Sequence, residues 1–111
     1  MGYYIHCSTT YQVEYGEGYF SNHTAAINRL FYENSDHIEC DCEDIECATH
    51  LKVPRADLAN LIVKILNKPK VFDEWLDRNK ISCTPEFFIK TLCEWIAVSD
   101  PRNEFVALTW F

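Results

Sequence analysis

The densest group of potentially reactive side chains lies between His37 and His50, where three cysteines and two histidines fall within fourteen residues. Thiolate and imidazole groups are the ligands of tetrahedral zinc sites, and the zinc candidates here are Cys40, Cys42, Cys47 and His50. The spacing argues against zinc, because structural sites usually contain paired Cys-x2-Cys motifs and this region has one Cys-x-Cys. The alternative is that these cysteines are small buried hydrophobic residues of a strand.

The same region is rich in carboxylates, which are Glu33, Asp36, Glu39, Asp41, Glu43, Asp44 and Glu46. An EF-hand calcium loop needs a glycine at a fixed position, and there is no glycine between residues 19 and 53. Two interpretations stay open: a solvated face, or a recognition surface that docks onto a basic groove. Acids two apart on a strand stand about 6.6 Å apart, close to the spacing of about 7 Å between successive phosphates of one nucleic-acid strand.

Nucleophilic catalysis has weak support in the sequence. Cys7 follows His6, but neighbours on a strand point to opposite faces. Cys47 and His50 are close enough to meet, but the surrounding acids raise a thiol pKa instead of lowering it. The chain has three glycines and no phosphate-binding or nucleophile-elbow motif. We therefore predict a protein that is not an enzyme; the alternative, a small enzyme, requires a deep polar pocket near His50 or His6.

Charge is distributed unevenly along the chain, whose net charge is −7. Residues 1–51 hold nine acids and one base, Arg29, whereas residues 52–111 hold eight acids and nine bases. Such asymmetry indicates an interaction surface. Direct binding of nucleic acid is disfavoured because phosphate recognition depends on clustered Lys and Arg. We predict a protein partner with a basic surface.

Targeting and membrane segments are not apparent. No run approaches the ~20 apolar residues that span a bilayer, and the first residues lack the basic region of a signal peptide. A cytoplasmic protein with reduced thiols is the expectation, with no membrane partner and no cofactor other than the possible zinc.

Apolar periodicity places these residues on strands and helices. Strict alternation over 3–15 predicts a strand, or a hairpin reversing near Ser8, before a turn at residues 16–18. A helix is expected from an N-cap at Ser21, with Phe20 stapled toward Ala25, to residues 34–36. Alternation over 37–47 predicts a second strand whose outer face is acidic.

The C-terminal half predicts three helices and a strand. The helices begin near Pro54, at Pro69 and at Thr84, where Pro or a capping residue stands at the start of an apolar stripe. Residues 104–111 are apolar on both faces, which predicts a strand in the middle of the sheet, beside the first. The fold class is α+β, a single domain over 1–111 with a small, mainly antiparallel sheet of three or four strands packed by about four helices.

The opening Met1-Gly2-Tyr3-Tyr4-Ile5 and the aromatic closing strand resemble those of small proteins encoded by phages and bacterial mobile elements. The resemblance covers the two ends of the chain and carries no functional motif. It implies that a partner would be a nucleic-acid-handling host or defence protein. The leading hypothesis is accordingly a non-catalytic, phage-type inhibitor or regulator that docks through its acidic face, with a zinc-stabilised domain as the alternative.

Overall fold

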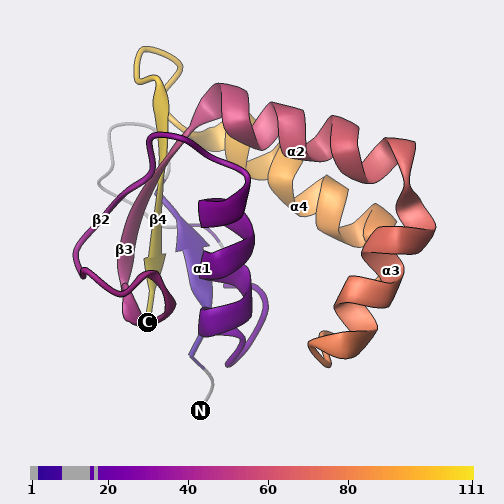
Figure 1. Ribbon diagram of the computed structural model, residues 1–111. Coiled ribbons are helices and arrows are strands. Elements are labelled where there is room, and N and C mark those ends of the chain that lie inside the picture. Colours follow the sequence, from indigo (N-terminus) through magenta and orange to yellow (C-terminus); the bar gives the residue numbers. More distant parts are fainter. Residues whose placement is uncertain (1–2, 9–15, 17) are drawn as a thin grey trace.

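The computed structural model describes residues 3–8, 16 and 18–111 (Figure 1). Its elements are β1 (Ile5–Cys7), α1 (Thr24–Glu33), β2 (Glu39–Cys40), the 3-10 helix η2 (Ile45–Cys47), β3 (His50–Pro54), α2 (Arg55–Asn67), α3 (Pro69–Arg78), α4 (Pro85–Val98) and β4 (Phe105–Trp110). The sheet has the order β1-β4-β3-β2, and each pair is antiparallel. The α+β prediction is confirmed, including the first and last strands as neighbours and the last strand inside the sheet.

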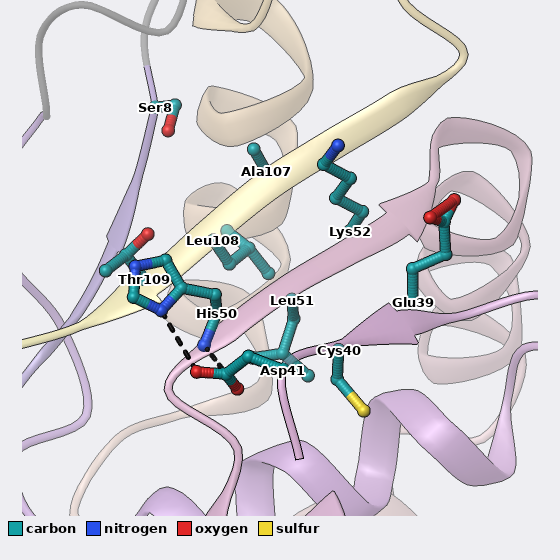
Figure 2. A pocket seen from close by; sticks show the side chains of 10 residues that line it. All are labelled: Ser8, Glu39, Cys40, Asp41, His50, Leu51, Lys52, Ala107, Leu108 and Thr109. Atoms are coloured by element: carbon teal, nitrogen blue, oxygen red, sulfur yellow. Dashed lines mark hydrogen bonds and ion pairs between the residues drawn. The ribbon is translucent and has the colours of Figure 1, made fainter. Parts of the chain in front are cut away.

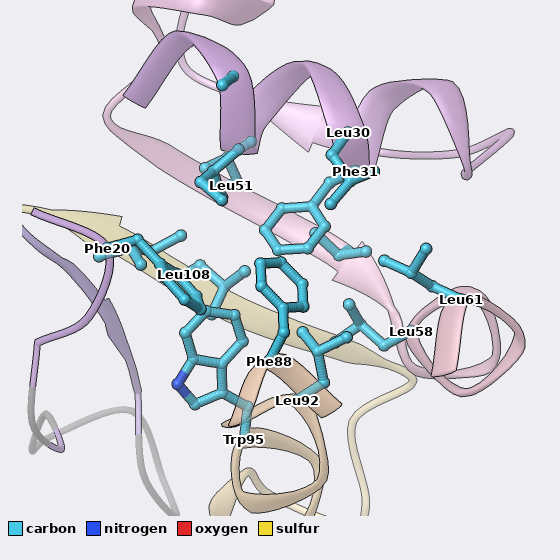
Figure 3. Packing of buried hydrophobic residues seen from close by; sticks show 14 of the residues in the cluster. Phe20, Leu30, Phe31, Leu51, Leu58, Leu61, Phe88, Leu92, Trp95 and Leu108 are labelled. Atoms are coloured by element: carbon cyan, nitrogen blue, oxygen red, sulfur yellow. The ribbon is translucent and has the colours of Figure 1, made fainter. Parts of the chain in front are cut away.

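Helices α1, α2 and α4 lie on one face of this sheet, and α3 packs against α2 and α4 (Figure 1). Alternate residues of the central strands point toward them, so Leu51 lies opposite Leu108 and Val53 opposite Val106 within the core. Phe88 on α4 is fully buried and points toward Phe31 of α1 (Figure 3). The other residues of β3 and β4 point to the opposite face, which carries no helix among the described residues. Polar side chains such as His50 and Lys52 are therefore exposed there.

Sequence signals at the helix starts of the C-terminal half are confirmed. The Thr84 hydroxyl accepts the Phe87 N–H at 3.1 Å, and Pro85 occupies the first helical position of α4. Pro69 opens α3 in the same way. No helix in the described part of the chain combines the length and the apolar character needed to cross a bilayer.

The predicted N-cap of the first helix is wrong. The helix begins at Thr24, three residues after Ser21. Phe20 and Asn22 have φ angles of 53° and 61°, so the chain makes a left-handed turn there instead of entering a helix. The ring of Phe20 stacks on Phe88, with ring centroids 4.7 Å apart. Phe20 is thus buried in the core and does not form the hydrophobic staple expected with Ala25.

The chain returns along β1 in a hairpin-like pairing. Ile5 and Tyr19 exchange backbone hydrogen bonds of 3.0 and 2.9 Å in an antiparallel bridge, and the Gly16 N–H donates to the Cys7 carbonyl. The hairpin predicted to reverse near Ser8 is not the one observed, because the partners of Ile5 and Cys7 are Tyr19 and Gly16, which lie beyond the end of the predicted strand. The remainder of that predicted strand, residues 9–15, and Glu17 in the predicted turn lie outside the described residues.

The predicted strand over 37–47 is wrong in length. Its ladder comprises two residues, Glu39 and Cys40, after which the chain bends and forms η2. Strand β3 was not predicted, although Leu51 and Val53 alternate with polar residues in the period of a strand. A two-residue strand at the sheet edge leaves most of the segment before β3 as loop, so tertiary contacts decide its path.

Candidate functional site

The segment that joins α1 to β3, residues 33–46, is called the acidic segment here; it runs along the β2 edge of the sheet (Figure 1). All seven of its acids are exposed: Glu33, Asp36, Glu39, Asp41, Glu43, Asp44 and Glu46. Arg29 on α1 lies 4.0 Å from Glu33 and 3.6 Å from Glu46. Among the described ion pairs, none joins these acids to a lysine or arginine of residues 52–111. The acidic segment therefore keeps most of its negative charge uncompensated by close contacts.

A buried asparagine holds one end of the acidic segment in place. Asn28 on α1 is fully buried, and its amide donates to the carbonyls of Ile45 and Ala48, both at 2.9 Å. Its side-chain oxygen accepts the indole N–H of Trp110 on β4 at 2.8 Å. These bonds connect α1, η2 and the last strand. The sequence offered no sign of this role, because an isolated Asn in a helix is ordinarily a surface residue.

Asp41 turns back toward β3 instead of standing in a row of strand carboxylates. Its oxygens accept bonds from the backbone N–H groups of Thr49 and His50, at 2.9 and 3.1 Å, and from the Thr49 hydroxyl. The hydrogen bond from the Thr49 hydroxyl, followed by that from the His50 backbone, holds the Asp41 pKa well below its usual range. The prediction that the acids stand at regular intervals along a strand is therefore wrong. Instead, the ionised Asp41 side chain holds this loop against the start of β3.

Beside Asp41, the face of the sheet that carries no helix forms a groove of about 310 Å³, called the sheet-face groove (Figure 2). The residues lining it are Ser8, Glu39, Cys40, Asp41, His50, Leu51, Lys52, Ala107, Leu108 and Thr109. Strand pairing aligns them, with His50 opposite Thr109, and Lys52 between Glu39 on one side and Ala107 on the other. One edge of the acidic segment and one lysine of the C-terminal half therefore meet at this groove.

An aspartate–imidazole pair lies at one end of the sheet-face groove. His50 Nδ1 is 3.2 Å from Asp41 Oδ2 and 3.0 Å from the Thr49 hydroxyl, so the ring is oriented and Nε2 points away from the carboxylate (Figure 2). This arrangement suits a general base. Ser8, directly after β1, donates its backbone N–H to Ala107 on β4. Because β4 lies between β1 and β3, Ser8 is two strand spacings, about 10 Å, from the strand of His50. Among the described residues, the hydroxyl in contact with the imidazole is that of Thr49, and it already donates its proton to the Asp41 carboxylate.

The cysteine at the first predicted strand is unsuited to nucleophilic catalysis. Burial raises the pKa of Cys7 to about 12, and its thiol donates to the Trp95 carbonyl at 3.6 Å. A thiol held protonated in the core does not attack substrates. His6, its neighbour in sequence, stacks on Phe111 with ring centroids 3.8 Å apart.

The four zinc candidates are not brought together. The Cys40 thiol donates to the Cys42 carbonyl at 3.0 Å, Cys42 Sγ lies 2.7 Å from Cys47 Sγ, and His50 is turned toward Asp41. Across the described ranges, no group of three or more metal-ligating side chains converges. The other interpretation, that these are buried strand cysteines, does not hold, since Cys40 and Cys47 are exposed and Cys42 is half-buried. Their thiols are accessible because the expected strand gives way to a loop.

Comparison of this chain with protein-family models, with curated proteins and with solved structures found no match.

Proposed function

We propose that this protein is a non-catalytic interaction domain whose acidic segment docks onto a basic surface of a partner protein. The observation that carries the proposal is the exposure of seven carboxylates along one continuous segment, accompanied by a single arginine within it and its supporting helix. Uncompensated charge of one sign accelerates association with an oppositely charged surface and makes it sensitive to salt.

The placement of the segment supports a docking role. It lies at the edge of the sheet, and its β2 ladder is two residues long, so its side chains project into solvent on a loop supported by the folded core. Asn28 and Asp41 anchor the loop through side-chain hydrogen bonds. Anchoring before binding reduces the ordering entropy that association costs.

The class of partner follows from charge and from the resemblance of the chain ends to phage and mobile-element proteins. A basic surface that recognises acids is most often one that handles nucleic acid, because phosphate binding requires clustered Lys and Arg. The proposed partner is a nucleic-acid-handling host or defence protein, which the domain inhibits or regulates by occupying that surface.

The test uses two variants with equal charge. Asp36→Asn, Glu39→Gln and Glu43→Gln, made together, remove three charges from the acidic segment without touching the anchoring residue Asp41. The matched control neutralises three exposed acids of α3, through Asp73→Asn, Glu74→Gln and Asp77→Asn. Each immobilised variant is exposed to bacterial lysate at low and at high salt, and bound proteins are identified by mass spectrometry.

The wild-type chain and the α3 variant should retain the same partner at low salt, and duplex DNA should displace it. The acidic-segment variant should lose this partner. Equal retention of the partner by both variants would remove the acidic segment from the function, and capture that duplex DNA leaves unchanged would rule out a nucleic-acid-binding surface on the partner.

A further inference from the structure

Two cysteine thiols, that of Cys42 in the acidic segment and that of Cys47 directly after it, lie unusually close together. Cys42 Sγ and Cys47 Sγ are 2.7 Å apart, well inside the about 3.5–4.0 Å optimum even for smaller, non-bonded carbon atoms. A disulfide bond is about 2.05 Å long, so a displacement of well under 1 Å joins the sulfurs. The separation suits bond formation better than it suits two independent thiols.

The backbone between the two cysteines is already folded into the loop that a bond would close. The Asp44 side chain accepts the Glu46 N–H at 3.0 Å, and the Cys47 N–H donates to the Asp44 carbonyl at 3.1 Å. The same carbonyl accepts the Cys47 thiol at 3.2 Å. Because the reduced loop has this turn, oxidation requires little rearrangement, and its cost in chain entropy is correspondingly low.

Both thiols are reachable from solvent, since Cys47 is exposed and Cys42 is half-buried. We propose that Cys42 and Cys47 form a site of reversible oxidation, at which a small disulfide such as oxidised glutathione converts the two thiols into an intramolecular disulfide. The proposal does not depend on the docking function.

The reaction balances in two exchange steps. One cysteine thiolate attacks a sulfur of oxidised glutathione and releases the first glutathione, which leaves a mixed disulfide on the protein. The second cysteine then attacks the protein sulfur of that mixed disulfide and releases the second glutathione. Two electrons and two thiol hydrogens pass from the protein to one molecule of oxidised glutathione, which becomes two of reduced glutathione.

The high pKa of Cys47 makes thiol–disulfide exchange at this site slow. The hydrogen bond with Cys42, followed by burial and the nearby charges, raises the pKa of Cys47 to about 11. A thiol of high pKa is mostly protonated at neutral pH, so exchange is slow and accelerates as the pH rises. It is also a poor leaving group, so attack of reduced glutathione on the Cys42 sulfur, which expels Cys47, is slow.

Tryptic cleavage separates this pair from the other cysteines. Cleavage after Arg29 and Lys52 yields a peptide spanning 30–52 with Cys40, Cys42 and Cys47, whereas Cys7, Cys83 and Cys93 fall in other peptides. The folded protein is equilibrated with oxidised or with reduced glutathione, alkylated with iodoacetamide in denaturant, digested and weighed.

The wild-type 30–52 peptide should take up three alkyl groups after the reduced buffer and one after the oxidised buffer. The control variant Cys40→Ser should fall from two to none, whereas Cys42→Ser and Cys47→Ser should form no internal bond, so that each alkyl group they lose is replaced by a glutathione adduct. Three alkyl groups in the wild type under both conditions, glutathione adducts in the wild type in place of an internal bond, or loss of two groups in Cys47→Ser without an adduct would overturn the assignment. When the unfolded protein is oxidised in urea, the Cys42–Cys47 disulfide should no longer be preferred over the Cys40–Cys42 and Cys40–Cys47 disulfides.

Discussion

Replacing the buried Asn28 by alanine tests how the acidic segment is anchored. In the native chain its amide donates to two carbonyls, those of Ile45 and Ala48, and its oxygen accepts the Trp110 indole N–H. Asn28→Ala removes all three bonds and leaves the three partner groups without the side chain that satisfied them. Two of these bonds lie wholly within buried surroundings, and the one to Ile45 is partly buried.

The cost follows from those three partners. A buried polar group deprived of its bond costs about 1–3 kcal/mol, while the half-buried carbonyl of Ile45 can regain water. We expect Asn28→Ala to lower the free energy of unfolding by about 3–4 kcal/mol. A chain of 111 residues has a total stability of about 6–17 kcal/mol, so this single change removes a large share of it.

The assay is urea unfolding at equilibrium, followed by tryptophan fluorescence, with Asn60→Ala as the matched control. Asn60 is exposed on α2, so that change should stay within about 0.5 kcal/mol of the native value. A further variant, Asn28→Asp, places a carboxylate against two carbonyls and should regain stability as the pH falls, because its protonated form can donate one bond. A loss below about 1 kcal/mol for Asn28→Ala would refute the anchoring argument.

Two further predictions concern ionised groups. Because the Asp41 pKa is lower in the folded than in the unfolded chain, its stabilisation is present above about pH 4 and is lost as the pH falls below that value. The unfolding free energy should therefore drop more steeply between about pH 4 and 2 in the native chain than in Asp41→Asn. The control Glu43→Gln should keep the native slope. Parallel curves of unfolding free energy against pH for all three proteins would contradict this prediction. The Arg55 guanidinium donates to the carbonyls of residues 96, 100 and 103 at 2.7–3.1 Å, a geometry that one ammonium group cannot reproduce. Arg55→Lys should cost about 2–3 kcal/mol in urea unfolding, against under about 0.5 for the exposed Arg78→Lys, and equal costs would disprove the role of the fork.

Local sequence signals located much of the C-terminal half. Pro69 and the Thr84-Pro85 pair mark helix starts because a proline or a capping hydroxyl suits the first turn, whose N–H groups lack helical partners. The final strand was expected inside the sheet beside the first, because it is apolar on both faces. The structure places it between β1 and β3. These features depend on neighbours within a few residues, which the sequence displays directly.

The acidic segment shows where such signals end. Alternation over 37–47 predicted a long strand, but a strand persists only where a partner supplies its hydrogen bonds, and β3 pairs with two residues, Glu39 and Cys40. The Asp41 carboxylate instead accepts the backbone N–H groups of Thr49 and His50 at the start of β3, where the chain bends. Ser21 failed as an N-cap for a comparable reason, because core burial of Phe20 drew the chain into a left-handed turn.

The sequence by itself determined the fold class, the order of most elements, and the gathering of negative charge in the N-terminal half. The tertiary structure decided which polar residues are anchors and which face solvent. Asn28 bonds to groups 17, 20 and 82 residues away, and the two strands that line the sheet-face groove most fully, β3 and β4, are joined by three helices. Hydrogen bonds and thiol proximity depend on separations of about 3 Å that must be held to within a few tenths of an ångström, and only the packed chain defines these. Periodicity and net charge depend on composition and order alone.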